Sequence, residues 1–396
     1  MEITKDVHYV GVNDRRTTQF EGLWPLPYGV SYNSYLVVGT EKVALIDTVE
    51  VCYCEAYLKK IRAVLGDRKI DYLVINHMEP DHSGSLPFIL SHYPDITFVG
   101  NKKTFEMIDG FYGTGGKRHV VAEGDSLDLG GHTLNFYLIP MVHWPETMVT
   151  YDTATSTLFA GDAFGCFGAL NGGCVDKDIN TDIYWDEMRR YYSNIVGKYG
   201  APVQRALKKL GGLELKHICS THGPVWVENV PRVIDIYDRL SRYEAEEGVV
   251  VAYGTMYGNT EAVAEVIAEE LCKQGIKNVV LRDVSRTHHS FIISDIFKYK
   301  GLIVGSCTYN TQLFPEMEAL LSKIAARDMK DRYVGYFGSY TWASAAYKKL
   351  GECVNALNFE VIGDAIEMKQ TLNASTEDAA RAMARAMAEK LKSERK

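Results

Sequence analysis

The pattern of apolar residues changes near Gly248, and this change limits the folds open to the chain. Before it, short apolar segments such as SYLVVG, KVALIDT, DYLVINH and STLFAGD are separated by Gly, Asp and Asn, which is typical of a sheet-rich layered domain. After it, VVVAYG, NVVLRDV, GLIVGS, YVGYFG and FEVIGD alternate with helical segments, which predicts a doubly wound parallel sheet. At 396 residues the chain exceeds the usual size of one hydrophobic core, so we expect two domains, 1–247 and 248–396.

Charge, hydropathy and cysteine usage narrow the possible partners and location. The formal net charge of -8 argues against nucleic acid as the main partner. The first residues contain no apolar stretch of signal-peptide length, and no later segment is long and apolar enough to span a bilayer, so we expect no membrane partner. The eight cysteines are scattered without a C-x-x-C pair, which predicts reduced thiols and a cytoplasmic location.

The segment NHMEPDHSG concentrates residue types that bind metals. Directly after the apolar run DYLVI it carries His77, Glu79, Asp81 and His82. A strand can fix the backbone before such a loop, and Pro80 favours an extended conformation at the residue before it. His77, Glu79 and Asp81 share one parity, so an extended loop would direct them to one side.

Three more potential ligands follow apolar runs further along the chain. His143 follows LNFYLIPMV, Asp162 follows TLFAG, and His222 follows LKHICST. A single His or Asp after a strand is usually a cap or turn residue. Here, however, each of four separate apolar runs is followed by residues of types that bind metals. The pattern predicts one metal site at the strand ends.

The order of these residues resembles that in the metallo-β-lactamase domain of the flavodiiron proteins. The surrounding segments HMEPDHSG, HWPETM, GDAFG and STHGPVW resemble that family too. That family fuses this domain to a flavodoxin-like one, so the resemblance extends from end to end. It implies an α/β multidomain chain with an N-terminal metallo-β-lactamase-like αββα sandwich and a C-terminal flavodoxin-like doubly wound parallel sheet. It also implies that His77, Glu79 and His143 hold one iron, that Asp81, His82 and His222 hold the other, and that Asp162 bridges them.

Glu79 stands where a zinc hydrolase with a His-x-His-x-Asp-His motif has its second histidine. Histidine-rich sites suit zinc, because neutral imidazoles help the ion to acidify a bound water. Anionic oxygen donors stabilise oxidised iron better than neutral nitrogen does, and three carboxylates nearly offset the charge of two Fe(II) ions. Glutamate at this position therefore favours a redox-active pair of irons.

The segment GTMYGNTEAV follows a buried strand and opens a helix in the second half. Its hydroxyls and backbone N–H groups can cradle a phosphate, and the loops SCTYNTQ and GSYTWAS also follow strands whose carboxyl ends bind ligands in such sheets. The order resembles flavodoxins, and FMN is favoured over FAD because no G-x-G-x-x-G loop is present. The residues expected to contact FMN are Thr255, Met256, Tyr257, Gly258, Asn259, Thr260, Ser306, Thr308, Tyr309, Asn310, Thr311, Ser339, Tyr340, Thr341 and Trp342.

Two residues in these loops depart from the family pattern. Cys307 stands where the family often has proline, and Thr341 stands where it often has glycine. We expect Thr341 to alter the backbone contacts near the flavin without preventing FMN binding.

The resemblance implies an oxidoreductase that reduces O2 to water, NO to N2O, or both. Reducing O2 to two waters takes four electrons, and two ferrous ions with a reduced flavin hold four. The sequence contains no rubredoxin-like segment after its flavodoxin-like half, so we expect a separate electron donor such as rubredoxin or a reduced deazaflavin. The family also implies a head-to-tail homodimer or a dimer of dimers.

Two other functions compete with this interpretation. One is a zinc-dependent hydrolase of the metallo-β-lactamase fold with a flavodoxin appendage, and Glu79 argues against it. The other is a flavin electron carrier whose metal domain is only structural, and the complete ligand set argues against that.

Overall fold

The computed structural model describes residues 1–394, which form two compact units that are separated between Ser241 and Arg242. The first strand of the second unit, β17 (Glu246–Gly254), begins shortly after this boundary. No helix within the described range is both long and apolar enough to cross a membrane.

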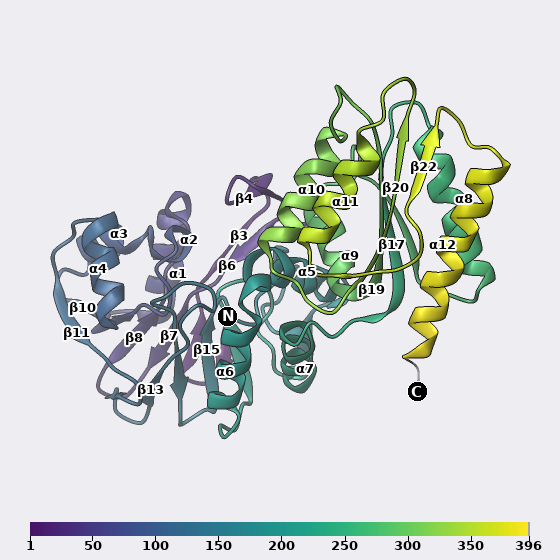
Figure 1. Ribbon diagram of the computed structural model, residues 1–396. Coiled ribbons are helices and arrows are strands. Elements are labelled where there is room, and N and C mark those ends of the chain that lie inside the picture. Colours follow the sequence, from purple (N-terminus) through teal and green to yellow (C-terminus); the bar gives the residue numbers. More distant parts are fainter. Residues whose placement is uncertain (395–396) are drawn as a thin grey trace. The chain divides into compact units, whose positions relative to one another are not determined.

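The N-terminal unit contains two main β-sheets (Figure 1). The first has the order β1–β2–β7–β8–β9–β10–β11, with bounds β1 Glu2–Thr4, β2 Val7–Tyr9, β7 Tyr35–Val38, β8 Val43–Ile46, β9 Tyr72–Val74, β10 Thr97–Gly100 and β11 Lys117–Val120. The second has the order β12–β13–β14–β15–β16, with bounds β12 Ser126–Asp128, β13 Thr133–Leu138, β14 Met148–Asp152, β15 Thr157–Gly161 and β16 His217–Ser220. The unit also contains two small two-stranded sheets: β3 (Val12–Asp14) with β6 (Val30–Tyr32), and β4 (Gln19–Phe20) with β5 (Trp24–Pro25).

Aromatic packing joins the two sheets. The ring of Tyr35 on β7 lies against that of Phe159 on β15, with centroids 5.5 Å apart. Buried side chains of α1 (Cys54–Leu65), α3 (Leu86–His92) and α4 (Lys102–Phe111) belong to the same apolar core as the seven-stranded sheet. The apolar face of each helix therefore covers the sheet, as amphipathic spacing predicts.

Three further helices follow β15 in the chain, two of them before β16 and one after it. They are α5 (Asp182–Tyr191), α6 (Gly200–Leu210) and α7 (Val230–Ser241). Tyr237 of α7 packs on Phe164, just after β15, with ring centroids 4.7 Å apart. Helix α7 thus contacts the segment that follows the end of β15.

The loop after β9 is extended only as far as Glu79. Glu79 has φ -55° and ψ 137°, as expected for a residue before proline. The short helix α2 (Pro80–Ser83) then begins, with proline at its first position. The expectation that Asp81 shares a side with His77 and Glu79 in an extended loop is therefore wrong, because a helical turn redirects it.

The C-terminal unit is a parallel sheet with helices on both faces (Figure 1). Its strand order is β18–β17–β19–β20–β21, with β22 also paired to β20, and this is the flavodoxin-like order. The remaining strands are β18 Val279–Asp283, β19 Tyr299–Cys307, β20 Tyr333–Tyr340, β21 Glu360–Val361 and β22 Ile366–Lys369. The helices are α8 Asn259–Lys273, α9 His289–Lys298, α10 Pro315–Ala326, α11 Ala346–Ala356 and α12 Ala374–Ser393.

The outermost position of this sheet differs from the expectation. The segment FEVIGD forms only the two-residue strand β21, and Gly363, with φ 74°, follows it closely. The chain then returns to β20 as β22, which pairs with Phe337–Tyr340. Two short strands therefore occupy the place where the sequence predicts one.

Candidate functional site

The seven potential ligands of the N-terminal unit are buried and fall into two groups. In each group the ligand atoms lie within 4.8 Å of one another. One group contains His77, Glu79, His143 and Asp162, and the other contains Asp81, His82 and His222. Strand ends position them, because β9, β15 and β16 lead into the segments that carry six of the seven, all except His143.

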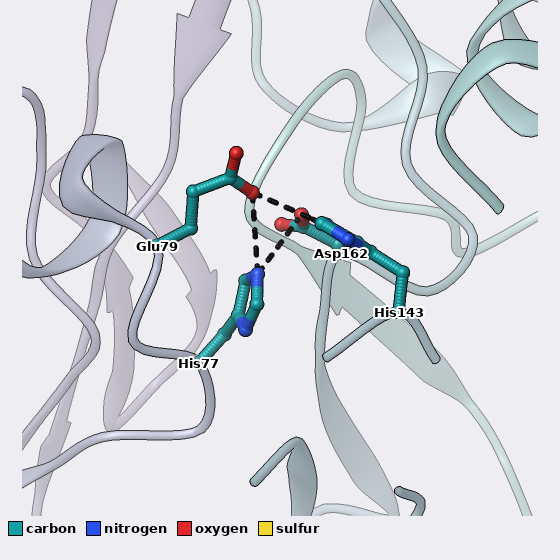
Figure 2. Close-up of side chains that lie close together, drawn as sticks. All are labelled: His77, Glu79, His143 and Asp162. Carbon is teal, nitrogen blue, oxygen red and sulfur yellow. Dashed lines mark hydrogen bonds and ion pairs between the residues drawn. The ribbon is translucent and has the colours of Figure 1, made fainter. Parts of the chain in front are cut away.

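Asp162, which follows β15, directs one oxygen to each group. Its Oδ2 lies 2.9 Å from Nε2 of His143 and 3.6 Å from Nε2 of His77, and Figure 2 shows these side chains with Glu79 pointing toward one another. Its Oδ1 lies 2.9 Å from Nε2 of His82, in the second group. A carboxylate in this position can bind two metal ions at once.

Hydrogen bonds on the outer side fix two of the imidazole rings. His222 donates from Nδ1 to the carbonyl oxygen of Ser31 at 2.7 Å. Nδ1 of His77 lies 2.8 Å from Oε1 of Glu146, which also accepts from the backbone N–H of Met78 at 2.9 Å. With Nδ1 protonated, each ring directs the lone pair of Nε2 into the site, as metal-binding histidines do.

The site buries three carboxylates whose ion pairs, among the described residues, are all with histidine. Glu79, Asp81 and Asp162 are at most 8 % exposed, and their partners are imidazole nitrogens. Burial lowers the pKa of His82 and of His143, but the neighbouring carboxylates outweigh it and raise both to about 9. The site therefore attracts positive charge, and metal ions would take the place of those protons.

Asp81 gives the most direct indication that the site suits a cation. Neither of its carboxylate oxygens accepts a hydrogen bond from the described residues, although Oδ2 lies 3.2 Å from Nε2 of both His82 and His222. The two imidazole nitrogens are themselves only 3.0 Å apart. One carboxylate oxygen and two imidazole nitrogens that converge in this way fit a bound cation, so the residues present suit a two-metal centre.

A buried scaffold behind the ligands was not identified from the sequence. Asp47, directly after β8, accepts from the backbone N–H of Asn76 at 2.7 Å and from its side-chain amide at 3.0 Å. Asn76 in turn accepts from the hydroxyl of Thr150 on β14 at 2.7 Å. Burial raises the pKa of Asp47 to about 6. A signal was available, because Asp47 ends the run VALI as Asp162 ends TLFAG.

Glu146 is the second unrecognised residue, and it lies three positions after His143 in the word HWPETM. Burial works to raise its pKa, but the hydrogen bonds from His77 and the Met78 N–H hold it below its usual value. It is therefore an anionic acceptor for the Nδ1 proton of His77.

A pocket of about 380 Å³ opens beside the two groups. Its wall includes Glu79 and Asp81 from the groups, and Glu21 and Glu50 from elsewhere. Burial and the adjacent Glu79 raise the pKa of Glu21 to about 8. Glu79 and Asp81 therefore border a cavity beside the two groups.

A second pocket lies at the carboxyl ends of β17, β19 and β20 in the C-terminal unit. Its lining includes many of the residues expected there: Thr255, Met256, Tyr257, Asn259, Thr260, Thr308, Ser339, Tyr340 and Thr341, together with Cys307 and Gln370. The hydroxyls of Thr260 and Ser339 lie 2.9 Å apart, and Gly258 donates its N–H to Oγ1 of Thr255 at 3.0 Å. The first turn of α8 has no side-chain cap, which suits an anion.

Six of the expected flavin residues do not line this pocket: Gly258, Ser306, Tyr309, Asn310, Thr311 and Trp342. Ser306 is buried, and its hydroxyl accepts the N–H of Phe314 at 3.0 Å. Tyr309 is 42 % exposed and Trp342 is 89 % exposed, so two aromatic faces are available for a flat ring. Asn310, Thr311 and Gly258 are absent from the pocket lining, and all three have positive φ.

Comparisons with known proteins agree with this architecture. The ODP family of beta lactamases matches residues 30–223, and the flavodoxin family matches residues 251–383. An anaerobic nitric oxide reductase flavorubredoxin of Escherichia coli is 30% identical over 91% of this chain and 76% of its own.

Two solved structures are similar over nearly the whole chain. The rubredoxin oxygen:oxidoreductase of the anaerobe Desulfovibrio gigas has a TM-score of 0.95 at 30% identity, covering 99% of this chain and 98% of its own. The flavodiiron protein of Giardia intestinalis has a TM-score of 0.94 at 26% identity, covering 99% and 96%. The chain therefore belongs to the flavodiiron protein family, as an oxidoreductase with a diiron centre in its β-lactamase-like domain and FMN in its flavodoxin-like domain.

Proposed function

We propose that this protein reduces O2 to water, NO to N2O, or both, with electrons that reach the irons through FMN from an external donor. The observation that carries the proposal is the pair of ligand groups that share Asp162. Similar proteins support both gases, because one is named a nitric oxide reductase and another a rubredoxin:oxygen oxidoreductase. Rubredoxin occurs in that second name and is the first donor to test, followed by a reduced deazaflavin. We place the reaction in the cytoplasm.

We propose that His77, Glu79 and His143 bind one iron, that Asp81, His82 and His222 bind the other, and that Asp162 bridges them. When bound, the irons and FMN supply the electrons for reduction of a diatomic gas. The chain supplies anionic oxygen donors that favour oxidised iron and two imidazoles oriented by Glu146 and Ser31. The flavin contacts would come from the fifteen residues that the sequence predicts.

Anaerobic turnover of the reduced, iron-loaded protein with each gas in turn tests the function. We expect consumption of O2, NO or both, with N2O as the product of NO. Zinc content with hydrolysis of a thioester or lactam would instead establish the hydrolase. Unchanged gas consumption after removal of the metals would establish an electron carrier.

Glu79→His should shift the metal preference from iron toward zinc, because a neutral imidazole replaces an anionic oxygen donor. We expect the zinc-to-iron occupancy ratio to rise about tenfold, equivalent to about 1.4 kcal/mol. Metal analysis after loading with an equimolar mixture measures the ratio. Glu106→His, an exposed exchange on α4, is the control and should change nothing. Full iron content with full gas turnover in Glu79→His would contradict the charge argument.

Asp162→Asn should weaken both metal positions, whereas His143→Gln should weaken only one. The reason is that each oxygen of Asp162 faces a different group, while His143 contacts only one of them. Iron analysis and Mössbauer spectroscopy distinguish the variants. We expect loss of magnetic coupling and of iron from both positions in Asp162→Asn, and retention of one iron in His143→Gln. A coupled diiron spectrum in Asp162→Asn would remove the bridging role.

We further propose that the protein acts as a head-to-tail homodimer or a dimer of dimers, in which the flavin of one chain serves the irons of another. A His143→Ala chain, deficient in iron, is mixed with an Asn259→Ala, Thr260→Ala chain, deficient in flavin, each being inactive alone. Exchange of subunits should restore part of the turnover, because one flavin–iron junction in the mixed dimer is intact. No recovery in verified heterodimers would mean that electrons pass within one chain.

A further inference from the structure

The two ligand groups offer a metal almost the same set of atoms. Each has two imidazole nitrogens, one carboxylate of its own, from Glu79 or Asp81, and one oxygen of the shared Asp162. The ligands themselves therefore give two iron ions little reason to differ in charge state. A difference between the two positions has to come from the residues behind the ligands.

The residue behind His77 differs from those behind the other ligand histidines. Nδ1 of His77, which faces away from its group (Figure 2), lies 2.8 Å from Oε1 of Glu146. Among the described residues, no other ligand histidine has a carboxylate within ion-pair distance of its Nδ1. Nδ1 of His222 donates to the neutral carbonyl oxygen of Ser31, and Nδ1 of His82 has no hydrogen-bond partner in the described range. A negative charge therefore supports one group and not the other.

Glu146 has a fixed and buried position. It is 1 % exposed, and its Oε1 accepts the backbone N–H of Met78 at 2.9 Å in addition to facing Nδ1 of His77. A buried charge is screened little by salt, so its effect on the imidazole persists in solution. Asp47, the other buried carboxylate behind the ligands, is hydrogen-bonded to Asn76 and not to an imidazole. Glu146 is therefore the residue that distinguishes the two groups.

An anionic acceptor at Nδ1 makes Nε2 of the same imidazole a stronger electron donor. A stronger donor stabilises Fe³⁺ relative to Fe²⁺, as an anionic oxygen ligand does. We propose that Glu146 makes the two groups unequal, so that a pair with one Fe³⁺ and one Fe²⁺ holds the Fe³⁺ in the group that contains His77. Glu146 is a positioning residue in this role, because it acts through His77 and belongs to neither ligand group. The proposal rests on the ligand assignment proposed above.

Glu146→Gln removes the charge but keeps an acceptor oxygen of the same reach, so it should raise the reduction potential of mainly one iron. The full chain with FMN and iron bound is titrated with dithionite, which supplies one electron to each Fe³⁺ in turn. Mössbauer and EPR spectra give the fraction of pairs that hold one Fe³⁺ and one Fe²⁺. We expect the equilibrium constant for forming these pairs from fully oxidised and fully reduced ones to fall about tenfold, which corresponds to about 59 mV. Glu106→Gln, an exposed exchange on α4, is the matched control and should leave both potentials unchanged.

ENDOR spectra of half-reduced samples identify the group that holds Fe³⁺. In a magnetically coupled pair, nitrogens bound to Fe³⁺ and nitrogens bound to Fe²⁺ have hyperfine couplings of different size and sign. We expect Glu146→Gln to change the coupling of a nitrogen bound to Fe³⁺ and to leave those of Fe²⁺ unchanged, because Glu146 pairs with the imidazole of His77. A change confined to nitrogens bound to Fe²⁺ would place the Fe³⁺ in the other group and overturn the proposal.

The remaining outcomes separate this proposal from the ligand assignment. Unchanged potentials in Glu146→Gln, or an equal shift in Glu106→Gln, would overturn the role of Glu146. Mössbauer spectra of the half-reduced, unmodified protein that show two irons of the same averaged valence would also overturn it, and this test does not depend on any variant. Absence of a magnetically coupled pair from the unmodified, iron-loaded protein would instead contradict the ligand assignment and the proposed function.

Discussion

Asp162 lies where the two sheets of the N-terminal domain meet, and its two oxygens face different sets of imidazoles. This arrangement requires the ends of β9, β15 and β16 to converge from separate sheets. It also places carboxylates in a buried site where, among the described residues, their ion pairs are all with histidine. Since such burial is unfavourable without a compensating cation, the folded domain is arranged around positive charge that the metals supply.

The position of the ligands relative to the strands could be read from the sequence. His77, Asp162 and His222 each follow an apolar run, and in the structure each follows β9, β15 or β16 within a few residues. The pattern along the chain predicted that residues at separate strand ends lie together, and the structure gathers these side chains into two buried groups. The flavin loops were recognisable for the same reason, because β17, β19 and β20 are parallel neighbours.

Of the residues that support the ligands, Asp47 ends an apolar run, but Glu146 and Asn76 could not be found in this way. Glu146 and Asn76 act through hydrogen bonds to partners that lie far away in the sequence or on another strand, and nothing local marks such a partner. The predicted orientation of Asp81 was wrong for a different reason. Side chains alternate in an extended loop, but the loop becomes helical at Pro80. The proline at position 80 carried the correcting signal, because proline is favoured in the first turn of a helix. The strand β22 was missed because it is short and follows a glycine with positive φ.

The contact of Tyr35 with Phe159 joins a strand of one sheet to a strand of the other, and Asn76 links the same two sheets close to the ligands. The distance between the sheets therefore affects the distance between the two ligand groups. A change of side-chain volume deep in the interior, remote from every ligand, can alter that distance by shifting one sheet against the other. Substitutions in the hydrophobic interior are therefore expected to shift the two ligand groups relative to each other, while every ligand stays the same.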